Sequence, residues 1–328
     1  MPLPSSGQIS FSQLAAELGN ACTNVGLRAY SACANLASPD SIIELYGKTC
    51  TPVYGAGTWS TGGALITARY GGAAAGTQNA GLAAAGYSNS GKSSCTEEYN
   101  GTSWLVGGSL SISRYYPTGI GTQNEGLVFG DYLTISCTEE YNGTSWSTGG
   151  SLIIGRHNSG GAGVQNEGLA VGGSRADLNS GGVSCTEEYN GTSWSTGGSL
   201  IIGRSARAAG TQNSGLGLGG NNLTCTEEYN GTSWSTGGSL ITYRRLSAGF
   251  GTQNAALTAG GNASTNLITC TEEYNGTSWS AGGALSIGRY LVGGNGSQNS
   301  GLVSGGYTNI TLSCTEEYNK SVTSICLA

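Results

Sequence analysis

The sequence has little charge, a single histidine and no long apolar run. Charged residues make up only 10% of the 328-residue chain, which contains 59 glycines. Such a composition is common in disordered chains, but disorder also requires few aromatic residues and no pattern that orders the chain. Here tyrosine and tryptophan recur at fixed positions, so we expect many short strands and tight turns. Because no run of ~18 apolar residues occurs, we expect no membrane insertion.

Further absences narrow the function classes. The formal charge is −6, whereas nucleic-acid binding needs clustered lysines and arginines, so we expect no nucleic-acid partner. The N-terminus lacks a basic region followed by an apolar run, and we therefore expect no secretory signal. His157 is the only histidine, and no cysteine–histidine spacing resembles a zinc site. No glycine-rich phosphate loop opens a helix. We expect neither a metal nor a cofactor.

The sequence does contain a repeated ten-residue motif, Cys-Thr-Glu-Glu-Tyr-Asn-Gly-Thr-Ser-Trp. It is complete at 95–104, 137–146, 185–194, 225–234 and 270–279; a truncated copy begins at Cys314 and a degenerate one at Cys50. The period of 40–48 residues indicates a repeat architecture. Of the 19 acidic residues, 12 are the paired glutamates of this motif, so the acidity belongs to the scaffold.

Each repeat carries signals for four short strands. Asn-Gly between two β-favouring runs predicts a hairpin whose turn residues both have positive φ. After the tryptophan come an arginine, a Gly/Ala-rich strand, a Gln-Asn turn and a Gly-Leu strand. Small residues suit the strand nearest to a crowded central axis. We interpret these residues as the structural motif of each blade: Tyr99, Trp104, Tyr141, Trp146, Tyr189, Trp194, Tyr229, Trp234, Tyr274, Trp279, Arg69, Arg114, Arg156, Arg204, Arg244 and Arg289.

This pattern resembles the kelch repeat, which joins Gly-Gly, a tyrosine and tryptophan about five residues apart, and an arginine further on. Gly172-Gly173, Tyr189, Trp194 and Arg204 match it, and the resemblance covers about 51–320. It implies an all-β fold, a six-bladed kelch-like β-propeller at 50–328, since six tryptophans and six Gln-Asn turns are present. The cysteine, the Glu-Glu pair and the Gln-Asn turn depart from the common kelch pattern. Copper oxidases of this type use more than one histidine, so the resemblance does not extend to them.

Closure of the propeller allows two arrangements. We expect the strand around Trp59 to complete the sixth blade, which pairs the two ends of the chain. The alternative is a closing strand at 320–327, which would leave Trp59 outside. Pro52 cannot donate to a ladder, so we expect an irregular lead-in before Trp59.

The cysteines and the paired glutamates have structural interpretations. One cysteine per repeat places neighbouring thiols a blade apart, beyond the ~7 Å limit for a disulfide, so we expect buried, reduced thiols. A Cys50–Cys326 bridge is left open. A glycosidase needs two carboxylates facing each other ~5–9.5 Å apart, but adjacent strand residues point to opposite faces. We expect one glutamate of each pair to contact a blade arginine and the other to face solvent or a turn amide.

Nearly all length variation lies in the loops between the second and third strands, opposite the Asn-Gly and Gln-Asn turns. Loops carry function on a fixed scaffold, so this face is the predicted binding face. Its polar and aromatic side chains suit hydrogen bonding and stacking on sugars. The alternative is neutral variation in exposed loops. The candidate ligand-binding residues are Tyr87, Asp131, Tyr132, Arg175, Asp177, Asn221 and Tyr307.

Residues 1–49 do not share the repeat. Residues 11–18 and 38–47 each favour a short helix, with a serine before and a glycine at the end. The stretch 4–13, followed by Glu17-Leu18-Gly19 and later Leu45-Tyr46-Gly47-Lys48, resembles the opening of tailed-bacteriophage virion proteins. In those proteins it precedes variable modules with a repeat motif like this one. The resemblance implies a tail-associated structural protein, made in the host cytoplasm, which agrees with reduced cysteines.

We therefore expect a non-enzymatic tail or tail-fibre protein of a virion. Residues 1–49 would anchor it to other virion proteins, and the propeller would contact a host-surface glycan or protein. The alternative is a purely structural spacer or decoration protein. A glycan-cleaving enzyme would need acids clustered in the variable loops, where only Asp131 and Asp177 lie. An intracellular adaptor would need a partner-recruiting helical domain of useful length. An oligomer is left open.

Overall fold

The computed structural model describes residues 49–175 and 182–327. This part of the chain is all-β, and it contains no helix that could span a membrane. The described residues fall into two compact units: Thr58–Asn319 forms a six-bladed β-propeller, and 49–57 with 320–327 belongs to the other. The helices expected at 11–18 and 38–47 lie outside the described residues.

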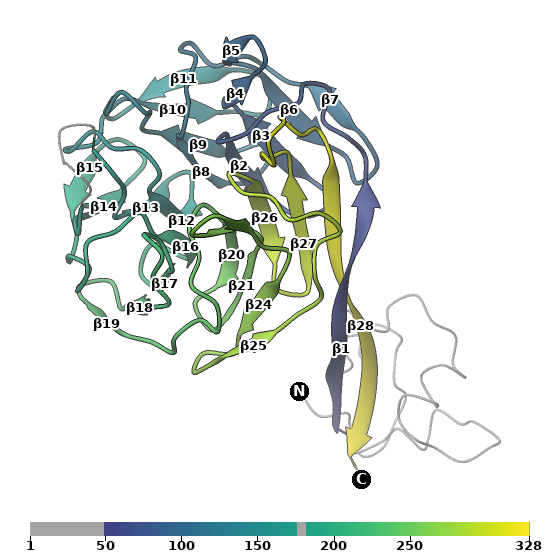
Figure 1. The fold of residues 1–328 in the computed structure, drawn as a ribbon. Coiled ribbons are helices and arrows are strands. Elements are labelled where there is room, and N and C mark those ends of the chain that lie inside the picture. Colours follow the sequence, from purple (N-terminus) through teal and green to yellow (C-terminus); the bar gives the residue numbers. More distant parts are fainter. Residues whose placement is uncertain (1–48, 176–181, 328) are drawn as a thin grey trace, which may run out of the picture. The chain divides into compact units, whose positions relative to one another are not determined.

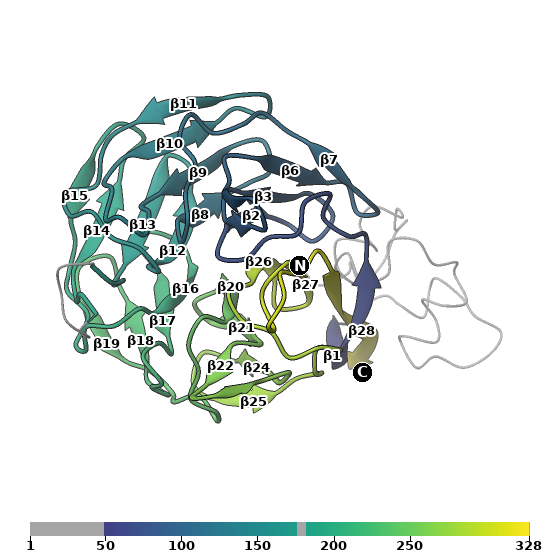
Figure 2. The same ribbon diagram turned by 45° about the horizontal axis from the view of Figure 1, so that its top comes forward.

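The propeller consists of six antiparallel four-stranded sheets arranged about a central axis (Figures 1 and 2). Blade 1 contains β2 (Ala73–Gly76), β3 (Gly81–Ala84), β6 (Thr96–Tyr99) and β7 (Trp104–Val106). Blade 2 contains β8 (Thr118–Gly121), β9 (Gly126–Phe129), β10 (Thr138–Tyr141) and β11 (Trp146–Gly149). Blade 3 contains β12 (Gly160–Val164), β13 (Glu167–Val171), β14 (Thr186–Tyr189) and β15 (Trp194–Thr196).

The second half of the propeller repeats this order, and two loops carry small hairpins of their own. Blade 4 contains β16 (Arg207–Gly210), β17 (Gly215–Leu218), β18 (Thr226–Tyr229) and β19 (Trp234–Thr236). Blade 5 contains β20 (Ala248–Thr252), β21 (Ala255–Ala259), β24 (Thr271–Tyr274) and β25 (Trp279–Ala281). Blade 6 contains β26 (Gly293–Ser297), β27 (Ser300–Ser304), β28 (Thr315–Leu327) and β1 (Thr49–Gly62). The hairpins are β4 (Tyr87–Ser88) with β5 (Gly91–Lys92), and β22 (Asn262–Ala263) with β23 (Asn266–Leu267).

The inner strands consist mainly of glycine and alanine because they crowd around the axis. Strands β2, β8, β12, β16, β20 and β26 contact one another in a closed circle. A Cβ atom added to Gly160 would lie 2.8 Å from the Cβ of Ala208 in the next blade. One added to Gly294 would lie 2.5 Å from the Cβ of Ala248. Larger side chains at these positions would force the blades apart.

The closing strand is β1, as expected from Trp59. Strand β1 is the outer strand of blade 6 and pairs with β28. The indole N–H of Trp59 donates to Thr271 Oγ1 (2.9 Å) and to the carbonyl of Gly283 (3.0 Å) in blade 5. Its ring lies 4.9 Å from that of Tyr318. The alternative closure by 320–327 alone is therefore wrong.

Strand β1 is also longer than expected. It runs from Thr49 through Pro52, where an irregular lead-in was predicted. An edge strand tolerates a proline because the missing N–H can face away from the partner, and β1 is an edge strand. The side chains of Cys50 and Cys326 lie outside the described residues.

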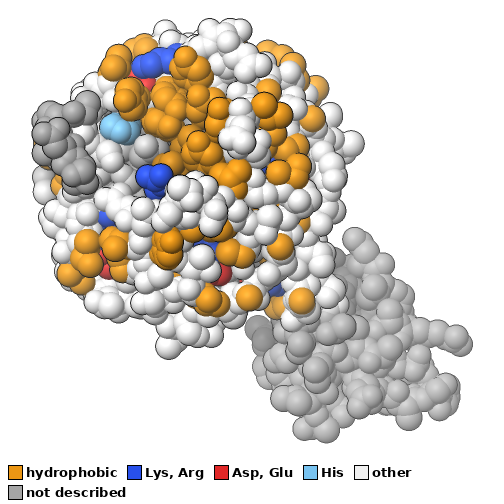
Figure 3. Space-filling view, in the orientation of Figure 1, with side chains coloured by type: hydrophobic (Ala, Val, Ile, Leu, Met, Phe, Trp, Pro, Cys, Tyr) orange, Lys and Arg blue, Asp and Glu red, His pale blue; other side chains and the backbone are white. Residues whose placement is uncertain are grey.

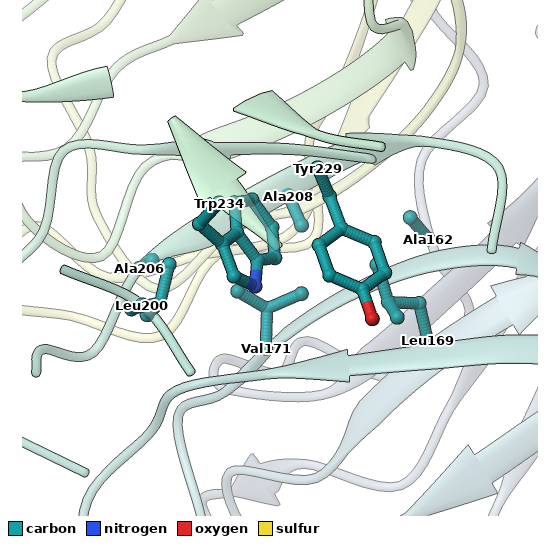
Figure 4. Close-up of a cluster of buried hydrophobic side chains, with 8 residues drawn as sticks. All are labelled: Ala162, Leu169, Val171, Leu200, Ala206, Ala208, Tyr229 and Trp234. Carbon is teal, nitrogen blue, oxygen red and sulfur yellow. The ribbon is translucent and has the colours of Figure 1, made fainter. Parts of the chain in front are cut away.

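The apolar core lies between neighbouring blades. In the contact between blades 3 and 4, Trp234 and Tyr229 pack against Val171 and Leu169 of blade 3 (Figure 4). The Trp234 indole donates to Thr186 Oγ1 of blade 3 at 3.0 Å. The glutamine of each Gln-Asn turn makes a second link to the preceding blade. Its amide donates to two backbone carbonyls there, as Gln212 does to Gly168 (3.1 Å) and Tyr189 (2.7 Å).

The predicted contact between one glutamate and the blade arginine is present in all six blades. The pairs are Arg69–Glu97, Arg114–Glu139, Arg156–Glu187, Arg204–Glu227, Arg244–Glu272 and Arg289–Glu316. All twelve side chains are buried. Each arginine precedes the inner strand of its blade, so the ion pair fixes the segment that enters the blade against the third strand.

The second glutamate of each motif has a different partner from the one expected. It accepts a hydrogen bond from the motif tyrosine of the next blade instead of facing solvent or a turn amide. The hydroxyl of Tyr141 donates to Glu98 Oε1 at 2.5 Å, and that of Tyr229 donates to Glu188 Oε1 at 2.6 Å. The circle closes where Tyr99 of blade 1 donates to Glu317 of blade 6 at 2.6 Å.

These tyrosines predict a loss of stability at alkaline pH. Burial and the bond to Glu98 raise the pKa of Tyr141 from 10.0 to about 12. A group whose pKa is raised on folding contributes stability that is fully present below its unfolded-state pKa. This contribution is lost as the pH rises through the folded-state pKa. The free energy of unfolding should therefore fall between pH 10 and 12, and chemical denaturation should show a smaller fall for Tyr141→Phe than for the wild type. Equal falls would contradict this role.

Two local expectations are wrong. The Asn-Gly turn is a four-residue loop between the paired residues Tyr99 and Trp104, and only Gly101 has positive φ (+87°). The Asn100 side chain replaces the second left-handed residue, because its Oδ1 accepts from the amides of Thr102 (3.0 Å) and Ser103 (2.9 Å). The six motif cysteines are free, as expected, but they are not buried, and Cys95 is exposed. Each of these cysteines is the last residue of the loop that leads into the third strand of its blade.

Candidate functional site

One face of the propeller carries both the loops of unequal length and one mouth of the central channel. The loops between second and third strands span 85–95, 130–137, 172–185, 219–225, 260–270 and 305–314. Because successive strands run in opposite directions, these loops lie at the end where each inner strand begins. The Gln-Asn and Asn-Gly turns lie at the opposite end. We call the first end the loop face.

The loop face carries a continuous cluster of aromatic side chains. The stacked pair Tyr115 and Tyr116, with ring centroids 3.7 Å apart, lies at its middle. Tyr132 contacts both rings of this pair at 5.8 and 5.9 Å and is 47% exposed. In Figure 3, hydrophobic side chains gather on the face that carries the single histidine. The tyrosine cluster consists of Tyr70, Tyr87, Tyr115, Tyr116, Tyr132, Tyr290, Tyr307 and His157.

Backbone pairing holds the cluster in place. The residue directly after a blade arginine pairs with the start of the variable loop, as Tyr70 does with Tyr87 and Tyr290 with Tyr307. In blade 2 a side chain contributes, since Asp131 Oδ1 accepts from the amide of Tyr115 at 2.7 Å. The other Asp131 oxygen pairs with Lys92 Nζ at 2.9 Å. The aromatic platform is therefore anchored to the blades, although it is built from loop residues.

The candidate residues from the sequence separate into three groups. Tyr87, Tyr132 and Tyr307 belong to the tyrosine cluster. Asp131 is fully buried and positions Tyr115, and exposed Asn221 accepts a long bond from the amide of Ser205 (3.4 Å) in blade 4. The third group is the loop of blade 3, where Arg175 is half-buried and Asp177 lies outside the described residues.

Sequence reasoning missed Tyr70, Tyr115, Tyr116, Tyr290 and His157. A signal for four of them exists, because the residue directly after the blade arginine changes from blade to blade. It is Tyr70, Tyr115, His157, Ser205, Arg245 or Tyr290. A search for variable length cannot detect a position that varies only in residue type.

Burial shifts the pKa of Tyr115, Tyr116 and His157 in the direction that favours the neutral form. It raises the pKa of the Tyr115 hydroxyl far above its usual range, and a hydrogen bond with Tyr116 adds to the effect. It also raises the pKa of Tyr116. Burial lowers the pKa of His157 below its usual 6.5, although the nearby Asp131 charge opposes the shift. The cluster thus offers apolar ring faces with neutral hydroxyl groups.

The channel mouth beside the cluster holds a cavity of about 80 Å³. Its lining is mostly glycine and alanine from the starts of the inner strands, with Tyr116 on one side and Arg207 on another. A second cavity of about 120 Å³ lies further along the channel and is lined mainly by glycine and alanine. Among the lining residues of both cavities, Arg207 alone is charged.

The tyrosine cluster and the adjoining cavity suit the binding of a ligand. Tyrosines supply rigid contact area with hydrogen-bonding tips, at a low cost in side-chain entropy.

Over the described ranges, no group of three or more histidine, cysteine, aspartate or glutamate residues is placed to hold a metal ion. Comparison with protein-family models and with curated proteins finds no match to this chain.

Proposed function

We propose that the propeller binds a glycan on its loop face. The observation that carries the proposal is the tyrosine cluster, a continuous aromatic platform anchored beside the channel mouth. The C–H faces of sugars stack on such rings, and their hydroxyl groups pair with tyrosine hydroxyls. Tyr87 and Tyr132 are exposed and therefore contribute little apolar burial to the stability of the fold. A contiguous exposed aromatic patch of this kind marks a binding surface.

Tyr132 should dominate this binding because it is the most exposed ring of the cluster and contacts both members of the stacked pair. Truncation of a central aromatic residue in an interface commonly costs about 2 kcal/mol, or more than tenfold in affinity. We expect Tyr132→Ala to lower glycan affinity by about that factor on a glycan array with the full chain. Tyr54, which is 45% exposed and outside the cluster, provides the matched control Tyr54→Ala.

The array also separates the proposal from its alternative. Binding that survives Tyr132→Ala would contradict a role for the cluster. An array with no wild-type signal would favour a purely structural spacer or decoration protein. In that case the exposed tyrosines would serve contacts with other proteins.

We further propose that the protein is a component of a phage tail or tail fibre and displays the propeller to the host surface. This proposal rests on the resemblance of residues 4–48 and of the repeat motif to virion proteins. Residues 1–49 would attach the chain to another virion protein. Particles assembled with a chain that lacks 1–49 should not contain the protein, and normal incorporation would refute the attachment.

A further inference from the structure

The channel mouth has a regular backbone pattern that is broken in one blade. In five blades, the residue two positions after the blade arginine has positive φ: Gly71, Tyr116, Asn158, Leu246 and Leu291. The amides of four of them, Gly71, Tyr116, Asn158 and Leu291, donate to the preceding blade around the mouth. Tyr116 donates to the Gly71 carbonyl (2.9 Å), Gly71 to Leu291 (2.8 Å) and Leu291 to Leu246 (2.8 Å).

Blade 4 departs from this pattern because its repeat is one residue shorter. The distance from tryptophan to glutamine is 18 residues there and 19 in the other repeats. Among the described residues, blade 4 has no left-handed residue at this position and no bond of this kind. A side chain makes the link to blade 5 instead, since Arg207 Nε donates to the carbonyl of Ser247 at 2.9 Å. In blade 4 an arginine side chain thus makes the link between neighbouring blades that backbone amides make elsewhere around the mouth.

Arg207 also differs from its equivalents in the other inner strands. The register aligns it with Ala73, Thr118, Gly160, Ala248 and Gly293, all of which are small. Its Nε is engaged, but none of the described carboxylates pairs with its guanidinium, whereas each blade arginine has a glutamate partner. Burial lowers the pKa of Arg207 to about 10, so the group is still charged at neutral pH.

A partly desolvated cation without a carboxylate partner raises the free energy of the fold, and an anion bound beside the guanidinium would offset this cost. Arg207 is half-buried as a residue and lines the 80 Å³ cavity. Such a cavity holds several water-sized groups, enough for a carboxylate. Guanidinium groups bind carboxylates through two parallel hydrogen bonds.

We propose that Arg207 binds a carboxylate of the ligand, so that the loop face recognises acidic sugars such as uronic or sialic acids. This inference rests on the proposed glycan binding and specifies its ligand class. The cavity and the tyrosine cluster share Tyr116, so a sugar that stacks on the cluster can place its carboxylate in the channel mouth. The cavity then selects for charge, and the tyrosines supply contact area.

The test is an array on which each uronic-acid or sialic-acid glycan is printed beside its carboxyl-reduced, neutral counterpart. We expect the full wild-type chain to bind acidic glycans at least about tenfold more tightly, the effect of one charged hydrogen-bonding partner. Arg207→Gln should remove the preference and leave neutral binding unchanged, and Arg207→Lys should restore part of it. Arg245→Gln is the matched control, because Arg245 is an exposed arginine of the same face.

Three results would overturn the inference. The wild type could bind both members of each pair equally, Arg207→Gln could keep the preference, or Arg207→Gln could lose neutral binding as well. In each of these cases glycan binding that depends on Tyr132 would still support the proposed function. If the wild type binds no glycan at all, both proposals fail.

Discussion

Glu187→Gln is expected to destabilise the propeller by about 3–5 kcal/mol, because it leaves the Arg156 charge buried without a counter-ion. Glu187 accepts from the amides of Ile153 (2.6 Å) and Ile154 (3.1 Å) and pairs with Arg156. Arg156 also donates to the carbonyls of Gly172 (3.0 Å) and Cys185 (2.8 Å), so it cannot turn towards water without breaking these bonds. The substitution keeps the volume of the side chain and changes its charge.

The adjacent glutamate provides the control. Glu188→Gln makes the same chemical change one residue away, but Glu188 is only half-buried and has Tyr229 as its partner (2.6 Å). A glutamine can still accept that bond, so the loss should be about 1 kcal/mol. Chemical denaturation of both variants measures the difference. Equal losses, or no loss in Glu187→Gln, would show that the ion pair does not hold the blade together.

Trp59→Ala should open the propeller where its two ends meet. Deletion of a large buried aromatic side chain costs about 3–5 kcal/mol, and the half-buried position of Trp59 places the expected loss near the lower end. Strand β1 reaches blade 6 from the other end of the chain, so no tight turn joins it to β28. Loss of Trp59 should therefore speed amide hydrogen exchange in β1 and β28 before the other blades open.

Trp146 is a matched control for this effect. It is also half-buried, and its indole donates to Thr96 Oγ1 (2.9 Å) and to the carbonyl of Gly108 (3.0 Å), as Trp59 does with its own partners. Its strand β11, however, is joined to β10 by a short turn. Trp146→Ala should lower stability by a similar amount without fast local exchange in β1. Unchanged exchange in β1 of Trp59→Ala would contradict closure by this strand.

Much of the fold follows from the spacing of a few residues. The tryptophans and Gln-Asn turns predict six blades, and Trp59 predicts the closing strand because the last repeat lacks a tryptophan of its own. In the structure, the indoles of Trp59, Trp104 and Trp146 each donate to a threonine of the preceding blade. The Arg–Glu pairs were also predictable, since buried charges need partners. The Tyr–Glu bonds between blades were not. They depend on how far one blade is rotated from the next, which no spacing within a repeat encodes.

The candidate site was only partly predictable for a related reason. Loop length pointed to the face that carries the tyrosine cluster and found three of its members, Tyr87, Tyr132 and Tyr307. The stacked pair Tyr115 and Tyr116 lies in a segment that does not vary in length, so loop length could not find it. Tyr116 also has positive φ (61°), which the sequence does not reveal. Arg207 was missed because its signal is a single deleted residue in one repeat, whose effect on the channel depends on all six blades.

The proposed recognition lies on the loop face, and the repeated motif has a structural role. One glycan-array experiment with the full chain tests this directly. It compares the wild type with a Tyr132→Ala/Arg207→Gln double variant and with a Thr192→Arg/Thr232→Arg double variant, whose exposed residues lie in the Asn-Gly turns of the opposite face. We expect the first variant to bind acidic glycans more than about a hundredfold more weakly than the wild type, the product of two roughly independent tenfold effects. The second variant should retain wild-type affinity for these glycans. Retention by the first variant and loss by the second would contradict the account.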